Sequence, residues 1–289
     1  MAEKHLASKR RAEKTTRIFI YAILILVSVL WIFPFFYLIL QSFGDHGALG
    51  FDSRSLFPNV WTGKNYLALF TSEATPFFKW WFNTFIIALA TAVLQTILVL
   101  MTAYALSRLR FNGRKGLMKL ILILGMFPGF LGMLVNYYIL SLLGLDGSMF
   151  SLIIVYFASS AMSYYVAKGF FDTVSRSLDE AVMIDGGSKN TVFWRIILPL
   201  SKPIIIYTVL ISFTAPWGDF MFGNFIAQAS KQITRSDWTV AVGLYNITDR
   251  SDFGIFCAGA VMVSIPIAVL FFWLQRYYVE GIAGGAVKG

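Results

Sequence analysis

Six long apolar stretches constrain this chain more than any other feature of its sequence. Each exceeds the length of about 20 residues that an α-helix needs to cross about 30 Å of hydrocarbon. They cover residues 18–40, 84–106, 117–142, 150–171, 204–227 and 253–274. The pattern predicts an all-α integral membrane protein with six transmembrane helices over residues 18–274. Segments 1–17 and 275–289 are predicted to lie outside the membrane.

The composition supports the same fold class. Hydrophobic residues make up 57% and charged residues 13% of the 289 residues, against about 45–50% and roughly 25% in soluble domains. A soluble fold of this length could not bury the excess apolar surface, so a bilayer is needed as solvent. The first stretch is too long for a signal-peptide core, and no small-residue cleavage site follows Leu40. It is therefore predicted to be an uncleaved anchor.

The basic residues predict the orientation. On one side of the six stretches lie 18 of the 24 Lys and Arg residues, while the other side holds Arg54, Lys64, Lys79, Lys231, Arg235 and Arg250. Basic residues gather in cytoplasmic connections, so both termini are predicted to be cytoplasmic. This bias also explains the net charge of +9 through contact with membrane lipid, without a nucleic acid partner.

The sequence offers little for catalysis or metal binding. His5 and His46 have no partner ligands nearby, and Cys257 is the single cysteine, so we expect no metal, no haem and no bound cofactor. The chain has no phosphate-binding Gly-x-x-x-x-Gly-Lys-Ser/Thr motif, no His-Glu-x-x-His and no Ser-Lys pair within the stretches. The chain is therefore predicted not to be an enzyme.

The connection between the fourth and fifth stretches, residues 175–203, is strongly patterned. Residues 177–180 read as a capping box, and Gly186 can end a short helix in the left-handed conformation. Ser188 can cap a second helix, whose apolar stripe is Val192, Phe193, Ile196 and Ile197. Two short amphipathic helices are predicted at the inner membrane surface. They could present a rigid knob to a cytoplasmic partner or form an ordinary interfacial loop.

This connection resembles a known motif. Glu180-Ala181-Val182, three further residues and Gly186, followed by residues 196–200 (IILPL) and Pro203, resemble the EAA loop of permease subunits in ATP-binding-cassette (ABC) importers. Val182 replaces the usual second alanine, and Gly187 stands where the family often has alanine.

The resemblance extends over most of residues 58–289. The matching positions are Pro58, Asn65-Tyr66, Asn83-Thr84, Ala103 to Arg108, Phe111, Phe213 to Phe220 and Gly281 to Gly289. Together they identify the chain as similar to the six-span carbohydrate permeases of the maltose and oligosaccharide type. No single piece would be specific.

The resemblance implies how such a chain couples to ATP hydrolysis. Glu180, Ala181, Asp185 and Gly186 would dock into a cleft of an ATPase subunit, which binds ATP and Mg in place of this chain. The tail residues Gly284, Gly285 and Lys288 would lie along the same interface. Without a partner, Glu180 would only cap a helix, Asp185 would sit in a solvated turn and the tail would be a flexible glycine-rich end.

The resemblance also implies partners: a second homologous permease, two ATPase subunits and an extracytoplasmic sugar-binding protein. In the outer connection, residues 230–252, Trp238 and Gly243 would belong to a loop that enters the binding protein. The alternative is a surface loop with one aromatic anchor at the membrane interface.

Six residues are candidates for the sugar pathway because sugar sites pair aromatic faces with amide and carboxylate groups: Asn136, Tyr137, Tyr138, Trp217, Asp219 and Asn224. The membrane depth of Asp219 is left open, although an ionisable group within a membrane is costly and usually functional. The resemblance assigns most sugar contacts to the second permease.

Maltodextrins are the first cargo expected from the resemblance, with glycerol phosphate or a uronate oligomer as alternatives. An ion-coupled secondary transporter is a further alternative. It would need acidic residues inside several helices, and Asp219 is the one plausible candidate.

Overall fold

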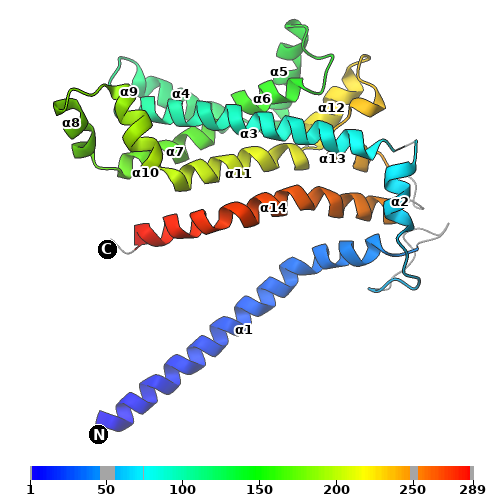
Figure 1. Ribbon diagram of the computed structural model, residues 1–289, viewed down its shortest axis with the longest axis horizontal. Helices are drawn as coiled ribbons and strands as arrows, with labels where there is room; N and C mark the ends of the chain where they lie inside the picture. The colour runs from blue at the N-terminus through cyan, green and yellow to red at the C-terminus, as the bar shows by residue number, and fades with distance from the viewer. Residues whose placement is uncertain (1, 46–55, 74, 248–252, 287–289) are drawn as a thin grey trace. The chain divides into compact units, whose positions relative to one another are not determined.

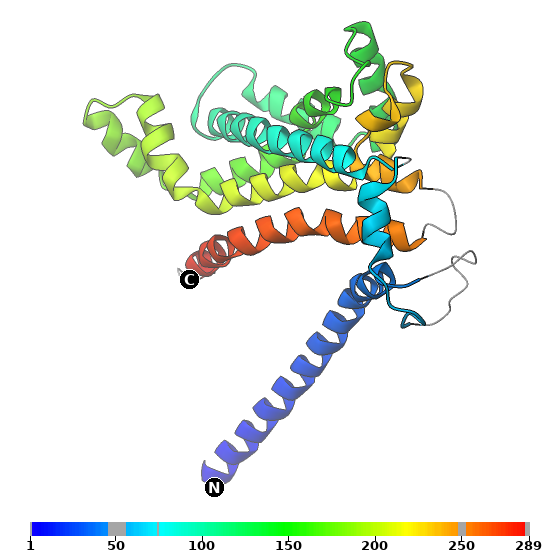
Figure 2. The ribbon, with the colours of Figure 1, turned by 45° about the vertical axis from the view of Figure 1, so that its right-hand side comes forward.

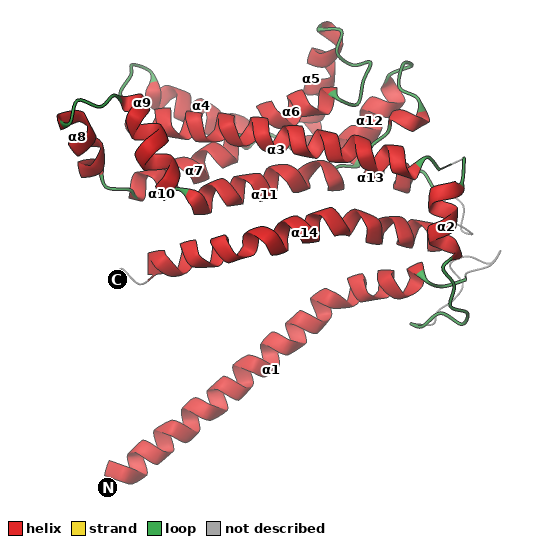
Figure 3. Ribbon diagram, in the orientation of Figure 1, coloured by secondary structure: helices red, strands yellow, loops and turns green. Residues whose placement is uncertain are grey.

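The computed structural model describes residues 2–45, 56–73, 75–247 and 253–286, and these residues form helices joined by loops (Figures 1 and 3). The fold class is thus helical, as predicted. The chain divides into two compact units, of which the first comprises residues 1–71 and 248–261 and the second residues 72–247 and 262–289. Each unit is described by itself below.

The first unit contains α1 (Ala2–Ser42), α2 (Lys64–Thr71) and the beginning of α14 (Phe253–Ala286). Nearly all side chains of α1 between Glu13 and Phe36 are exposed, as expected of an apolar helix that meets lipid or another protein. Asn65 at the start of α2 donates to the carbonyls of Ser42 and Gly44, at 2.9 and 2.8 Å. A single amide thus orders the chain where it leaves α1.

The second unit is built around α3 (Phe77–Arg108). It packs chiefly against α6 (Ser151–Ala158), α7 (Ala161–Thr173) and α11 (Lys202–Gly218). The helices α3 and α11 run side by side in both ribbon views (Figures 1 and 2). In the most apolar 18-residue segment of α3, 50% of the residues are buried inside the protein, against 6% in the corresponding segment of α1. The helix α3 is therefore the central helix of this unit.

Three helices of the described residues are long and apolar enough to cross a membrane: residues 13–42, 77–108 and 253–275. They contain the first, second and sixth predicted stretches. Two bent helix pairs reach the same length and apolarity together, which would bring the number to five. The predicted third, fourth and fifth stretches are therefore not continuous helices.

The third stretch divides into α4 (Arg114–Gly125) and α5 (Gly129–Leu142), which meet at 105°. Pro128 explains the break because it lacks an N–H group and its ring excludes the preceding turn of a helix. Gly125 allows close contact between α4 and α7, since a Cβ there would lie 3.0 Å from the Cβ of Ala161.

The fourth stretch divides into α6 and α7 at Ser159-Ser160. The hydroxyl of Ser160 accepts from Gln95 in α3 at 2.7 Å and lies 3.1 Å from the carbonyl of Phe157, which it donates to. A serine that bonds neighbouring backbone competes with helix continuation. The buried amide of Gln95 therefore stabilises the break from outside the stretch.

The fifth stretch divides into α11 and α12 (Met221–Ala229), separated by Asp219 and Phe220. A carboxylate oxygen of Asp219 accepts from the backbone N–H of Phe222 at 3.0 Å, which satisfies a free donor in the first turn of α12. The second bent pair joins residues 189–200 to α11 at 79°.

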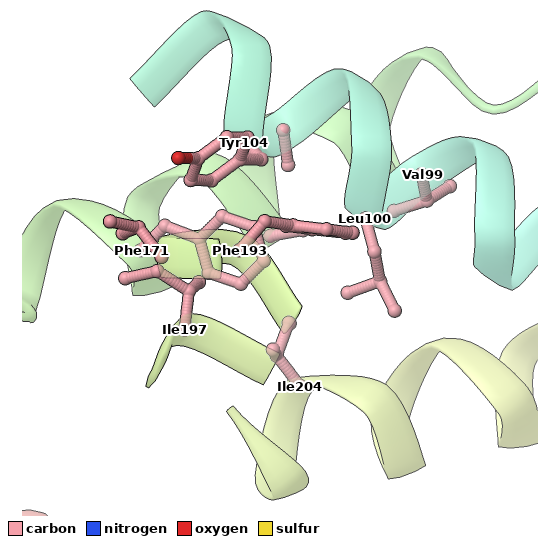
Figure 4. Packing of buried hydrophobic residues seen from close by; sticks show 10 residues of the cluster. Val99, Leu100, Tyr104, Phe171, Phe193, Ile197 and Ile204 are labelled. Atoms are coloured by element: carbon pink, nitrogen blue, oxygen red, sulfur yellow. The ribbon is translucent and has the colours of Figure 1, made fainter. Parts of the chain in front are cut away.

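Two apolar clusters lie towards the two ends of α3. One gathers Val99, Leu100, Ala103 and Tyr104 with buried residues of α7 and of residues 192–204. Figure 4 shows Tyr104, Phe171, Phe193, Ile197 and Ile204 packed together at its centre. The other places Ile87 with buried residues of α5, α6, α12 and α13 (Val240–Tyr245). The two clusters fix different surface elements to one helix.

Candidate functional site

The patterned connection forms two short helical segments, α8 (Arg176–Ile184) and residues 189–200, at one end of α3 (Figure 1). The second segment consists of α9 (Lys189–Val192), a π-helical turn over Phe193–Ile197 and α10 (Leu198–Leu200). We call residues 175–200 the coupling element. The predicted pair of short helices is confirmed.

The first helix of the coupling element begins earlier than predicted. Its N-cap is Ser175, whose hydroxyl accepts from the N–H of Ser177 at 3.3 Å, so the predicted capping box of Ser177 with Glu180 is wrong. The reason is tertiary: Arg108 binds the carbonyl of Val174 at 2.7 Å and pairs with Asp179 at 3.4 Å. Together these contacts place Asp179 in the first turn.

The turn between the two segments follows the predicted local chemistry. Gly186 has φ +80°, which favours glycine, and the N–H of Gly187 donates to the carbonyl of Val182 at 2.8 Å. Ser188 then caps α9 in a reciprocal capping box with Thr191. Both predictions are confirmed. They could be made from the sequence because both motifs depend only on neighbouring residues.

The last turns of α3 attach the coupling element. Tyr104 donates to the carbonyl of Lys189 at 2.7 Å, and its ring lies 4.9 Å from that of Phe193. Ser107 donates to Asp172 at 2.5 Å, the carboxylate that Lys168 also pairs with. The second segment of the coupling element is thus attached to α3 through Tyr104, and α8 is attached to it through the pair of Arg108 with Asp179.

The outward side of the coupling element is partly apolar. Ile184 is 84% exposed, Met183 49% and Leu178 41%, and the predicted site residues Glu180, Ala181, Asp185 and Gly186 are also exposed. An open cleft of about 640 Å³ lies beside them. Its lining residues are Val182, Asp185, Gly186, Gly187, Asn190, Thr191, Trp194, Arg195 and Ile196.

The opposite end of α3 holds the described part of the outer connection, residues 230–247. Trp80 donates to the carbonyl of Arg235 at 2.6 Å, and Asn83 donates to those of Ser236 and Trp238 at 3.1 and 3.2 Å. The hydroxyl of Thr84 accepts from the N–H of Val240 at 2.8 Å. Residues 248–252 of the predicted loop lie outside the described residues.

The two residues predicted for this loop have packing roles. Trp238 is half-buried and stacks on Trp80 with ring centres 6.1 Å apart, while the guanidinium of Arg235 lies within 6 Å of both rings. Gly243 is buried against the same ring, where a Cβ would lie 2.1 Å from Trp80. Only glycine fits at this position without displacement of Trp80.

The six candidate pathway residues make separate local contacts. Asp219 accepts from Tyr156 at 2.7 Å, and Asn224 accepts from Asn246 at 3.3 Å. Trp217 is buried, with its ring 5.6 Å from that of Trp81. The ring of Tyr137 lies 5.1 Å from that of Phe225. Half-buried Asn136 and exposed Tyr138 complete the set on α5.

The predicted tail begins inside a helix, since α14 continues through Gly284 and Gly285 to Ala286. Lys288 lies outside the described residues. Sequence reasoning missed Tyr104, Ser107 and Arg108 as attachment residues, although all three fall within the matched stretch from Ala103 to Arg108. Their polar side chains at the end of an apolar stretch were the available signal.

Comparison with known proteins defines the class. The chain matches the family described as binding-protein-dependent transport system inner membrane component over residues 100–284, and it belongs to that family. The coupling element and most of α11 to α14 fall within this match. The expected resemblance to importer permeases is thereby confirmed.

Curated relatives match over nearly their full length. The chain is 35% identical to the galactooligosaccharides transport system permease protein GanQ of Bacillus subtilis, with 94% of this chain and 95% of GanQ covered. It is 34% identical to the maltodextrin transport system permease protein MdxG of the same organism, with 96% and 98% covered.

The fold also resembles that of a chain in the crystal structure of a bacterial ABC transporter that imports the acidic polysaccharide alginate. The TM-score is 0.75 at 20% identity, with 93% of this chain and 98% of that chain covered. At this identity the likeness concerns the fold alone.

The contact between Gly243 and Trp80 can be tested by Gly243→Ala. A methyl group 2.1 Å from the ring must displace it, and overpacking of this kind costs about 1–3 kcal/mol. We expect a lower midpoint of thermal unfolding for the purified protein in detergent. Gly132→Ala in α5, where a Cβ meets nothing within 4 Å, should leave the midpoint unchanged or raise it. Equal midpoints for both variants would contradict the packing role.

The left-handed turn can be tested by Gly186→Val. A β-branched residue at φ +80° is strained by about 1–2 kcal/mol, so the turn should open more often. We expect faster tryptic cleavage after Lys189, followed by mass spectrometry. Gly169→Val, within α7 and with open space at its Cβ, is the control and should be cleaved like the wild type. Unchanged cleavage in Gly186→Val would show that the turn does not require glycine.

Proposed function

We propose that this chain is one permease subunit of a bacterial ABC importer for oligosaccharides. It would pair with a second homologous permease, bind one of two ATPase subunits and receive sugar from an extracytoplasmic binding protein. The observation that carries the proposal is the coupling element, whose outward face is apolar at Ile184 and Met183 while its inward face is fixed to α3. Family membership supports the same assignment.

The proposed topology has six membrane crossings with both termini cytoplasmic, in the bacterial inner membrane. Three crossings would be the long helices of residues 13–42, 77–108 and 253–275. The remaining three would be the predicted third, fourth and fifth stretches, each of which contains a break. Broken backbone at membrane depth must be covered by protein or line an aqueous cavity. A translocation pathway at the interface with the second permease would meet that requirement for α4 to α7, α11 and α12.

The mechanism follows from the attachment of the coupling element. ATP and Mg would be bound and ATP hydrolysed on the partner ATPases, whose closure displaces the coupling element. Because Tyr104 and Arg108 fix this element to α3, its displacement would carry α3 and the helices packed on it. The chain itself would act as a transporter subunit and not as an enzyme.

The cargo proposed is a neutral oligosaccharide of the maltodextrin or galactooligosaccharide type. Two relatives, at 34 and 35% identity over almost the whole chain, are named for transport of these sugars. The uronate alternative is less supported because the alginate transporter shares 20% identity. Hydrogen bonds already occupy Asp219 as a helix cap and as the acceptor of Tyr156, which argues against an ion-coupling carboxylate.

The topology can be tested by cysteine labelling in a Cys257→Ala background, since Cys257 is the single native cysteine. Asn112→Cys and Lys231→Cys introduce thiols at exposed positions of two loops. A membrane-impermeant maleimide added to intact spheroplasts should label Lys231→Cys alone, and permeabilisation should allow labelling of Asn112→Cys. The opposite pattern would invert the proposed orientation.

The ATPase contact can be tested by Ile184→Asp. Ile184 is 84% exposed in this chain, so the change should leave the fold intact but place a carboxylate in an apolar interface. Desolvation of an unpaired carboxylate should reduce co-purification of the ATPase with the tagged chain at least about tenfold. The second permease should still be recovered.

Ile184→Leu keeps the apolar contact and is the matched control, with ATPase recovery expected at the wild-type level. If Ile184→Asp retained the ATPase, the coupling element would not be the docking surface. If the wild-type chain were recovered alone and imported sugar without ATP, the importer assignment itself would fail.

A further inference from the structure

The helix α3 is uninterrupted over 32 residues. It contains neither proline nor glycine, whereas α1 includes Pro34 and α14 includes Pro266. At 1.5 Å per residue it is about 48 Å long, more than the thickness of a bilayer core. It packs against α6, α7 and α11 along its length, so bending it would disturb much of the second unit.

The end of α3 near the coupling element holds two other helices through one buried arginine. The side chain of Arg108 is 4% exposed. Its guanidinium donates to the carbonyls of Phe171 and Val174, at 2.8 and 2.7 Å, and pairs with Asp179 at 3.4 Å. Arg108 thus joins the end of α7 to the first turn of α8, a geometry that needs the planar fork of arginine.

The other end of α3 holds the outer connection through Trp80, Asn83 and Thr84. These three side chains bond to backbone atoms between Arg235 and Val240. Because these bonds are made to backbone atoms, they fix the path of residues 235–240 independently of the side chains in that segment. Residues at the two ends of one stiff helix therefore hold the two surface elements that partner proteins would contact.

We infer that α3 is a strut that carries conformational signals between the two faces of the membrane, with Arg108 and Asn83 as its positioning residues. This inference rests on the proposed function, because it assumes an ATPase at the coupling element and a binding protein at the outer connection. Displacement of α8 moves Arg108 and hence α3, and α3 moves the backbone of residues 235–240. Occupation of the outer connection acts on the ATPases by the reverse route.

The contacts of Arg108 with α7 and α8 are tested by Arg108→Lys in the complete importer reconstituted in proteoliposomes. Lysine keeps the positive charge but cannot reach two carbonyls and a carboxylate together. Loss of a hydrogen bond to a charged group corresponds to about tenfold or more in an equilibrium constant. We expect the ratio of sugar imported to ATP hydrolysed to fall by about that factor. Arg110→Lys, at an exposed arginine two residues further on, is the control.

The contact of Asn83 with the outer connection is tested by Asn83→Leu. This change removes both hydrogen bonds while the new side chain has a size similar to that of asparagine. We expect weaker stimulation of ATP hydrolysis by the sugar-loaded binding protein. Lys79→Leu, an exposed position one turn earlier, is the control. In the double variant Arg108→Lys with Asn83→Leu, stimulation of ATP hydrolysis by the binding protein should be no weaker than in the more impaired single variant. Both changes interrupt the same route through α3, so their effects on this stimulation should not add.

Three results would overturn the inference. If Arg108→Lys lowered import and hydrolysis in proportion, the arginine would only support folding. If either variant matched its control, the contacts of that residue would have no role in carrying the conformational signal. If the losses of the two variants multiplied, they would act independently. The proposed function fails separately, if the wild-type complex shows no ATP hydrolysis that depends on the binding protein.

Discussion

The burial of Arg108 determines much of the architecture around the coupling element. The charge of a guanidinium whose side chain is 4% exposed must be paired within the protein, since an unpaired buried charge costs several kcal/mol. The acceptors come from the end of α7 and the first turn of α8, segments more than 60 residues further along the chain. The chain must therefore leave α7 at Val174 and begin α8 at Arg176. The position of α8 relative to α3 depends on these contacts, while Tyr104 holds the second segment of the coupling element at Lys189.

The breaks in the apolar helices obey a similar rule of satisfied polar groups. Each break frees backbone N–H and C=O groups that a bilayer cannot bind, so each needs a local partner. Ser160 with Gln95 serves one break, and Asp219 serves another as the cap of α12. Tyr156 adds a bond to the same carboxylate at 2.7 Å. Asp219 thus has one partner in the break itself and a second in α6.

The sequence was a good guide wherever local chemistry decides the structure. Gly186 and Ser188 could be assigned because a left-handed turn and a capping box involve residues within a few positions. The start of α8 could not, because it depends on Arg108, 71 positions before Asp179. Hydropathy located the apolar stretches but not their breaks. Pro128 was visible, whereas Ser160 differs from any membrane serine only through its contact with Gln95.

The predicted site residues divide along the same line. Gly243 and Trp238 were selected as loop residues, yet both pack on Trp80, a long-range contact that no pattern in their own segment reveals. The coupling residues were selected by a motif of contiguous positions, and the structure exposes them together.

The exposed apolar residues of the coupling element differ in kind from those of α1. In α1, apolar side chains continue around the whole helix over many turns, as lipid contact requires. In α8, Ile184 and Met183 share one short helix with Arg176, Asp179 and Glu180, so this helix cannot enter hydrocarbon without the burial of charges. The exposure of 84% of Ile184 to water is unfavourable, and no acidic side chain in the described part of the chain shields its apolar surface. A protein surface that combines an apolar pocket with basic groups would satisfy both requirements, and these are the features that the proposed ATPase contact of α8 requires.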